Sequence, residues 1–279
     1  IDGGVEDLQA GLAYTENVRQ MDALLRAAIE GREESVNLSS CHIKAVNVGT
    51  YYARLINDNA RYFYVDTEYK YASISGYVTT FYPTYIGDYT AEDSAAFEEK
   101  ADLALAGVDS GWNEEQKILY IHDWLVTHIE YDYSLSGYNA YNALVEGSAV
   151  CQGYTLAFDY LMQKLDIESD FIGSDKLNHC WNMVSAGGSR YFVDTTWDDS
   201  RDYRLFCSHE NFLVSGKRLY DNSHASKDWV DSLGENVSSA LTDTSYDGFY
   251  WSGSVMPLAI HGQVCVYIDS AAPGRICMH

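Results

Sequence analysis

Basic side chains are scarce in this sequence. The 18 Lys and Arg residues stand against 41 Asp and Glu residues, which leaves a formal net charge of −23 at pH 7. A large surplus of negative charge repels both nucleic-acid phosphates and anionic lipid headgroups. We therefore expect no nucleic-acid partner and no binding to an anionic membrane surface.

Long apolar runs and prolines are also rare. No stretch reaches the roughly 18 consecutive apolar residues of a membrane-spanning helix, so we expect no membrane span. The 3 prolines and 24 tyrosines among 279 residues favour packed structure over linkers or disorder, in one large domain or two modest ones. The start, IDGGVEDLQ, lacks the basic and apolar parts of a signal peptide and has no Met. Together with the abrupt end, GRICMH, this indicates a processed or trimmed chain.

The cysteines show no compact pattern. Their wide spacing does not match the framework of a small disulfide-stapled domain, so the cysteines alone leave the redox compartment undecided. The six cysteines are Cys41, Cys151, Cys180, Cys207, Cys265 and Cys277.

The residue patterns predict alternating helical and strand-rich parts. Helical spacing of apolar residues predicts a helix over 15–31, and Tyr, Val, Ile and Thr predict a small antiparallel sheet within 51–86, including the segments YYARLI, RYFYVD and YASISGYVTTFYP. Helices are predicted again over 90–107 and from Asn113, with Gln116 completing a capping box. We place a boundary between an N-terminal helical and β accessory subdomain, 1–110, and a catalytic domain with a C-terminal β extension, 111–279.

Cys151 lies where a predicted helix begins. Apolar residues recur at helical spacing from this position onward. The free N–H groups and the dipole of a helix N-terminus favour a thiolate, the form of cysteine that attacks carbonyl carbons. Gly147 and Gly153 are expected to let a substrate backbone approach the sulfur.

Residues 178–197 predict a β-hairpin around Gly187 and Gly188. A two-residue loop sets Trp181 opposite Asp194 and His179 diagonally across from Asp194. A four-residue loop sets His179 directly opposite Asp194. Because strand side chains alternate with a period of two, either register puts His179 and Asp194 on one face. We expect Asp194 to accept the Nδ1 proton of His179, which leaves Nε2 for a thiol.

Each of these residues also has a purely structural interpretation. Cys151 is a candidate packing thiol, His179 a candidate core histidine and Asp194 a candidate turn cap. What favours chemistry is that a nucleophile, a base and an orienting carboxylate occur together.

Three segments carry a family resemblance. In order along the chain, AVCQGYTLAFDYLMQKLDI, NHCWNMV and RYFVDTTWDD resemble the Cys, His and Asp segments of the transglutaminase-like superfamily, in its bacterial branch similar to kyphoscoliosis peptidase. The resemblance covers about residues 112–200. It implies an α+β, papain-like core in which the Cys151 helix packs on an antiparallel sheet that carries His179 and Asp194. It also implies acyl transfer at amides. Calcium dependence is not implied, because the sequence has no acidic loop of the twelve-residue ligand pattern.

The resemblance implies catalytic roles for Cys151, His179 and Asp194. Cys180 is a departure, because relatives usually carry Ala after the histidine. Its thiol is interpreted as packing, as a redox lock or as functionless. The activity we expect is that of a cysteine peptidase, with protein-glutamine transglutaminase or amidase activity, or a non-catalytic binding module, as alternatives. Candidate substrate-binding residues or oxyanion donors are Trp124, Tyr141, Trp181 and Trp197.

A metal site is the competing hypothesis. His179, Cys180, Cys207 and His209 are suitable zinc ligands, but their spacing matches no strong zinc pattern. We therefore expect neither a metal nor a cofactor. The partner expected is a protein or peptide substrate, with cell-surface or cell-wall peptide as one class, and the location expected is secreted or at the cell surface.

Overall fold

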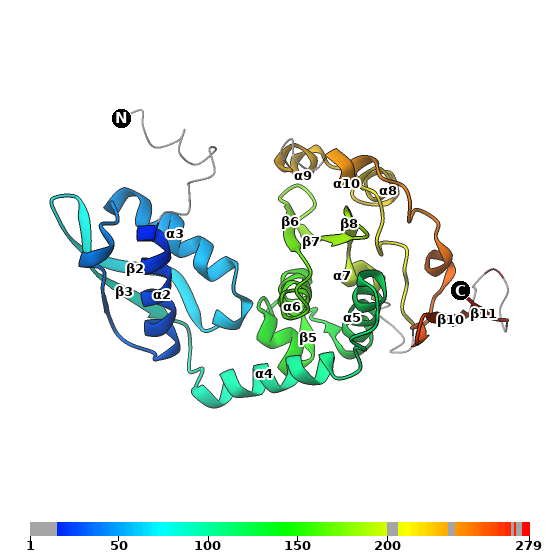
Figure 1. Ribbon diagram of the computed structural model, residues 1–279, viewed down its shortest axis with the longest axis horizontal. Coiled ribbons are helices and arrows are strands. Elements are labelled where there is room, and N and C mark those ends of the chain that lie inside the picture. Colours follow the sequence, from blue (N-terminus) through cyan, green and yellow to red (C-terminus); the bar gives the residue numbers. More distant parts are fainter. Residues whose placement is uncertain (1–15, 200–205, 234–237, 269–270, 272–274) are drawn as a thin grey trace. The chain divides into compact units, whose positions relative to one another are not determined.

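The computed structural model divides into two compact units, Ile1–Ala91 and Glu92–His279 (Figure 1). The structure describes residues 16–199, 206–233, 238–268, 271 and 275–279. Residues 90–107 were predicted within the first subdomain, whereas almost all of the helix found there, α4 (Ala91–Leu105), lies in the second unit.

The first unit combines two amphipathic helices with a small antiparallel sheet. The sheet has the strand order β1-β3-β2. The predicted first helix is present, and the segment YASISGYVTTFYP of the predicted sheet forms a hairpin that turns at Ser75 and Gly76, which have positive φ angles. The elements are α2 (Glu16–Glu30), β1 (Val36–Asn37), η1 (Ser39–Cys41), α3 (Ala45–Asn57), η2 (Ala60–Tyr62), β2 (Val65–Ile74) and β3 (Tyr77–Tyr85).

The segment YYARLI is helical, so its predicted strand is wrong. It lies in α3, where Val48, Tyr51, Tyr52 and Leu55 are buried at helical spacing. Tyrosine favours strands only on a pleated, half-buried surface, and here the buried face of a helix gains more from packing. RYFYVD is also only partly a strand, because a 3₁₀ turn precedes β2.

The second unit is built around helix α6 (Cys151–Lys164) and the antiparallel sheet β6-β7-β8 (Figure 1). Before α6 lie α5 (Glu114–His128), with the predicted capping box at Asn113 and Gln116, and the short parallel pair of β4 and β5. The elements up to β8 are α4, α5, β4 (Glu130–Tyr131), η3 (Asn142–Glu146), β5 (Ser148–Ala149), α6, β6 (Ser169–Ser174), β7 (His179–Ala186) and β8 (Ser189–Val193).

Short elements follow the sheet and lead to a C-terminal sheet of order β11-β10-β9. They are α7 (Thr195–Asp198), α8 (Gly216–Asn222), α9 (Lys227–Ser232), α10 (Ser238–Thr242), η5 (Tyr250–Gly253), β9 (Ala259–His261), β10 (Val264–Ile268) and β11 (Ile276–Met278).

The core of the second unit places the two sides of the site. Helix α6 packs against β6 and β7 and buries Tyr154, Phe158 and Leu161. A further apolar cluster, which includes Trp181 and Trp229, packs α8, α9 and α10 against the sheet. The structure is therefore the expected α+β arrangement, with a cysteine-bearing helix on an antiparallel sheet. Among the described residues, no helix is both long and apolar enough to cross a membrane.

Candidate active site

Cys151 is the first residue of α6, as the sequence predicts. Val150 precedes it in an extended conformation, so the thiol sits in the first turn, where backbone N–H groups have no helical acceptor. Gly153 has a packing role. A Cβ atom there would lie 2.6 Å from the Cβ of Ala149. This glycine therefore allows α6 to pack closely on its own chain, and its expected part in substrate approach stays a prediction.

The hairpin that carries the histidine has the two-residue loop. Gly187 and Gly188 have φ angles of 57° and 83°, which glycine adopts without strain. Strands β7 and β8 pair with Asn182 opposite Val193. This is the first of the two predicted registers, and the ladder ends one pair before Trp181 and Asp194.

His179 and Asp194 are hydrogen-bonded, but through the ring nitrogen that was not expected. Nε2 of His179 lies 2.7 Å from Oδ2 of Asp194. Because a carboxylate can only accept, Nε2 carries the proton in this bond. Nδ1 is therefore the nitrogen that remains for the Cys151 thiol, with which the ring also forms a hydrogen bond.

Asp194 is fully buried and has more partners than the sequence indicated. Its Oδ2 also accepts a hydrogen bond from Nε2 of His224, at 2.9 Å. Its Oδ1 caps helix α7 by accepting the N–H groups of Thr196 and Trp197. The carboxylate thus both orients the histidine and caps a turn. Sequence reasoning missed His224, which no local pattern connects to Asp194.

The Cys151 thiol is held in its ionised form. A hydrogen bond from the Cys180 thiol is the main cause, burial opposes it, and the His179 ring and the Cys180 backbone N–H add to it, lowering the pKa of Cys151 to about 4. In contrast, its interaction with Cys151 and its burial raise the pKa of the Cys180 thiol. The unexpected second thiol is therefore a hydrogen-bond donor to the first. All six cysteines are free.

The histidine is held in its charged form. Burial disfavours the imidazolium, but the charge and hydrogen bond of Asp194 and the contact with Cys151 outweigh it and raise the pKa of His179 to about 9. The pKa of Asp194 lies well below its usual range, because His179 and His224 outweigh the effect of burial. At neutral pH the site therefore holds a thiolate, an imidazolium and a carboxylate in sequence.

A family model named for the transglutaminase-like superfamily matches residues 102–197, which include Cys151, His179 and Asp194. Residues 102–197 therefore form a transglutaminase-like domain. Two solved structures are similar over part of their length. One is a TGase, at 13% identity and a TM-score of 0.34, over 49% of this chain and 46% of that one. The other, from Cytophaga hutchinsonii, is provisionally described as a cysteine protease, at 18% identity and a TM-score of 0.30. The match covers 46% of this chain and 61% of that one. A comparison with curated proteins finds no match.

Two of the four aromatic candidates lie beside the histidine in the transglutaminase-like domain. The ring of Trp197 stacks on His179 with centroids 4.5 Å apart, and it is partly exposed. Trp181 is buried, with its ring centroid 5.7 Å from that of His179. Trp197 also lines a pocket of about 560 Å³ together with Thr196, Asp199, Glu210, Asn211, Arg218, Asn222 and Ser223.

The other two candidates have other partners. The hydroxyl of Tyr141 donates a hydrogen bond to Asp93 on α4. Trp124 stacks on His128 of its own helix, with nearly parallel rings. Neither contact joins them to the histidine, and their role in holding an oxyanion stays a prediction.

The four zinc ligands considered from the sequence do not form one cluster. His179 and Cys180 belong to the thiolate site, whereas Cys207 and His209 lie together elsewhere in the same unit. Among the described residues, two groups contain at least three side chains of ligand type close enough to share a metal ion. One is His179, Asp194 and His224, and the other contains Cys207 and His209.

Proposed function

We propose that the transglutaminase-like domain is a thiol acyltransferase that acts as a cysteine peptidase, with Cys151 as nucleophile, His179 as acid and base, and Asp194 as the orienting carboxylate. The observation that carries the proposal is the chain of hydrogen bonds from Cys151 to His179 and from His179 to Asp194, in a site where the pKa of Cys151 falls to about 4 and that of His179 rises to about 9. A packing cysteine needs no such partner.

The reaction follows from these protonation states. The Cys151 thiolate attacks the carbonyl carbon of an amide, and the charge moves to the carbonyl oxygen, near the free N–H groups of the first turn of α6. As the C–N bond breaks, the imidazolium of His179 gives its Nδ1 proton to the leaving amine. A water molecule then attacks the thioester, Nδ1 takes the proton of that water, and the acid product leaves a free thiolate.

Substrate access is the role we propose for the pocket beside Trp197. The pocket contains both a carboxylate, Glu210, and a guanidinium, Arg218, together with amide and hydroxyl groups. Such a lining suits the polar backbone and side chains of a peptide better than an apolar ligand. We place the activity outside the cell or at its surface, on protein, surface peptide or cell-wall peptide.

Alkylation of the thiols tests the nucleophile. Iodoacetamide at neutral pH should modify Cys151 much faster than the other five cysteines, as read by peptide mass mapping. His179→Ala should remove this advantage, and Cys41→Ser, which changes a buried thiol in the other unit, should keep it. Equal, slow labelling of all six thiols would instead identify a non-catalytic binding module.

The product distinguishes hydrolysis from amide exchange. A glutamine-containing peptide is incubated with the protein and an excess of a primary amine, and the masses of the products are measured. Cleavage of the peptide bond supports the peptidase. Incorporation of the amine at glutamine, with the chain intact, would identify a transglutaminase, and loss of ammonia alone an amidase.

A further inference from the structure

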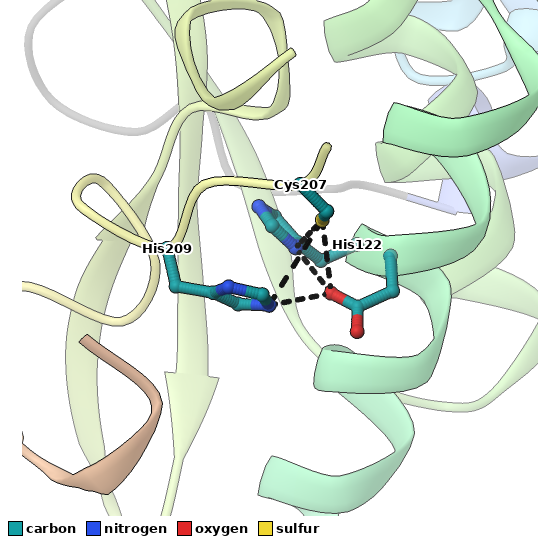
Figure 2. A group of neighbouring side chains, drawn as sticks. His122, Cys207 and His209 are labelled. Atoms are coloured by element: carbon teal, nitrogen blue, oxygen red, sulfur yellow. Dashed lines mark hydrogen bonds and ion pairs between the residues drawn. The ribbon is translucent and has the colours of Figure 1, made fainter. Parts of the chain in front are cut away.

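We propose that His122, Asp123, Cys207 and His209 bind a zinc ion in the interior of the second unit. All four side chains are buried, and their ligand atoms lie within 4.8 Å of one another. Figure 2 shows the side chains of His122, Cys207 and His209 converging on one point. His122 comes from helix α5, and Cys207 and His209 come from the chain segment that faces it. The site lies outside the proposed thiolate chemistry and does not depend on it.

The distances suit a tetrahedral zinc ion. Oδ1 of Asp123 lies 2.9 Å from Nδ1 of His122 and 2.7 Å from Nε2 of His209. Sγ of Cys207 lies 3.4 Å from the same oxygen and 4.0 Å from each of these nitrogens. Tetrahedral bonds of the usual zinc lengths separate sulfur, nitrogen and oxygen ligands by about 3.3–3.6 Å. The nitrogen–oxygen separations are shorter than this and the sulfur–nitrogen separations are longer, so shifts of roughly 0.5 Å bring the four atoms to tetrahedral spacing.

The outer atoms of the ligands are all engaged. Nε2 of His122 bonds to Oδ2 of Asp198, and Nδ1 of His209 bonds to the backbone carbonyl of Ser254, both at 3.2 Å. Oδ2 of Asp123 accepts the N–H of Leu258 at 2.7 Å. Histidines that bind metals nearly always give their second N–H to a carboxylate or a carbonyl in this way.

These outer bonds determine what the inner atoms present. A carboxylate and a carbonyl can only accept, so Nε2 of His122 and Nδ1 of His209 carry protons. In the neutral rings the inner nitrogens then present lone pairs to Oδ1 of Asp123, itself an acceptor. Contacts this short between acceptors require positive charge among them, and Cys207, which meets all three, has only one proton to donate. One divalent cation satisfies the four atoms together.

The ligand set and its burial indicate a structural zinc. One sulfur, two imidazole nitrogens and one carboxylate oxygen are ligands that zinc accepts, and four protein ligands complete its tetrahedral shell. No coordination position remains for water or substrate. The ion would tie α5 to the 207–209 segment. Asp198, which holds His122, is the last residue of α7, whose first turn is capped by Asp194. The ion therefore also supports the helix next to the thiolate site.

Elemental analysis of the full chain is the first test. The protein is made without a histidine tag, passed over a gel-filtration column in metal-free buffer, and measured by mass spectrometry of the elements. We expect one zinc ion per chain. Cys207→Ser should lose it, whereas Cys41→Ser, the matched change of a buried thiol in the other unit, should retain it.

A second variant guards against a ligand change that prevents folding. Asp198→Asn keeps all four ligands and changes the outer partner of His122, a carboxylate that also accepts the N–H groups of Asn211, so it should bind zinc about 10- to 100-fold more weakly. The affinity is measured by competition with a coloured chelator. Chelation of the ion should also lower the melting temperature of the wild-type protein.

Cobalt gives the deciding spectrum. Co²⁺ in place of zinc should give the strong visible bands of a tetrahedral ion and a thiolate-to-metal charge-transfer band, both absent from Cys207→Ser. A folded wild-type protein that holds far less than one equivalent of metal, and gives no such bands after Co²⁺ is added, would overturn the proposal. The cluster would then be a proton-filled hydrogen-bond network.

Discussion

Nε2 of His179 donates its proton to Oδ2 of Asp194, from the start of β7 to the residue that follows β8, and the hairpin of these two strands turns on two glycines. This bond turns Nδ1 of the ring toward the helix that carries Cys151. The carboxylate that makes the bond is itself held from its other side by His224 and by the first turn of α7. The predictions below follow from this arrangement.

The thiolate and imidazolium should coexist over a wide pH range. Since the pKa of Cys151 is about 4 and that of His179 about 9, the pair forms as pH rises through the lower value and is lost as pH rises through the higher one. Peptidase activity, which requires both charges, should be bell-shaped between these limits. The check is a rate profile from pH 3 to 10, and a single rise near the ordinary thiol pKa would contradict the ion pair.

Asp194→Asn should lower the pKa of His179, because the charge of Asp194 is the main force that raises it against burial. The upper limit of the activity profile should therefore move to lower pH. Loss of the orienting carboxylate should also slow acyl transfer by about 100- to 10,000-fold, the usual contribution of a positioned acid and base. An unchanged upper limit would show that Asp194 only caps α7.

Cys180→Ala should raise the pKa of Cys151, because the Cys180 thiol is the main hydrogen-bond donor to the thiolate. The pH at which alkylation of Cys151 becomes half-maximal should move upward. Cys180→Ser is the matched variant, since its hydroxyl can still donate, and it should keep the low value. If Ala and Ser behave alike, the second thiol is packing rather than a donor.

His224→Ala should destabilise the second unit. The variant removes a buried hydrogen bond to a carboxylate, so the free energy of unfolding should fall by about 1–3 kcal/mol. Urea unfolding followed by tryptophan fluorescence measures it, because all 6 tryptophans lie in this unit. His128→Ala, at an exposed position on α5, should change the free energy little. Equal effects of the two variants would show that the hydrogen bond from His224 to Asp194 does not stabilise the unit.

Gly153→Ala should also destabilise this unit and disturb Cys151. The new methyl group would meet the Cβ of Ala149 and two backbone oxygens, none of which can move easily. Overpacking of this kind costs about 1–3 kcal/mol, more than the helix propensity that alanine gains. Gly173→Ala on β6, where the nearest atom is a side-chain carbon at 3.5 Å, is the control. A stable variant with normal Cys151 alkylation would show that α6 can shift.

Local patterns predicted most of the helices and the hairpin that carries His179. They were misleading where tyrosine clusters favour strands in isolation, as in YYARLI, because tertiary packing decides which face of such a segment is buried. They also predicted the wrong ring nitrogen of His179, since sequence spacing places a residue on a face but does not orient its ring.

The sequence by itself determined that Cys151 begins a helix and that His179 and Asp194 share one face of a hairpin, because helical period, strand alternation and glycine turns are local. Only the tertiary structure decided that His224 holds Asp194 and that Cys180 donates to Cys151. It alone brought His122 and Asp123 of α5 to Cys207 and His209, which lie far along the chain. Contacts between distant segments depend on how whole elements pack, and residue spacing does not record that packing.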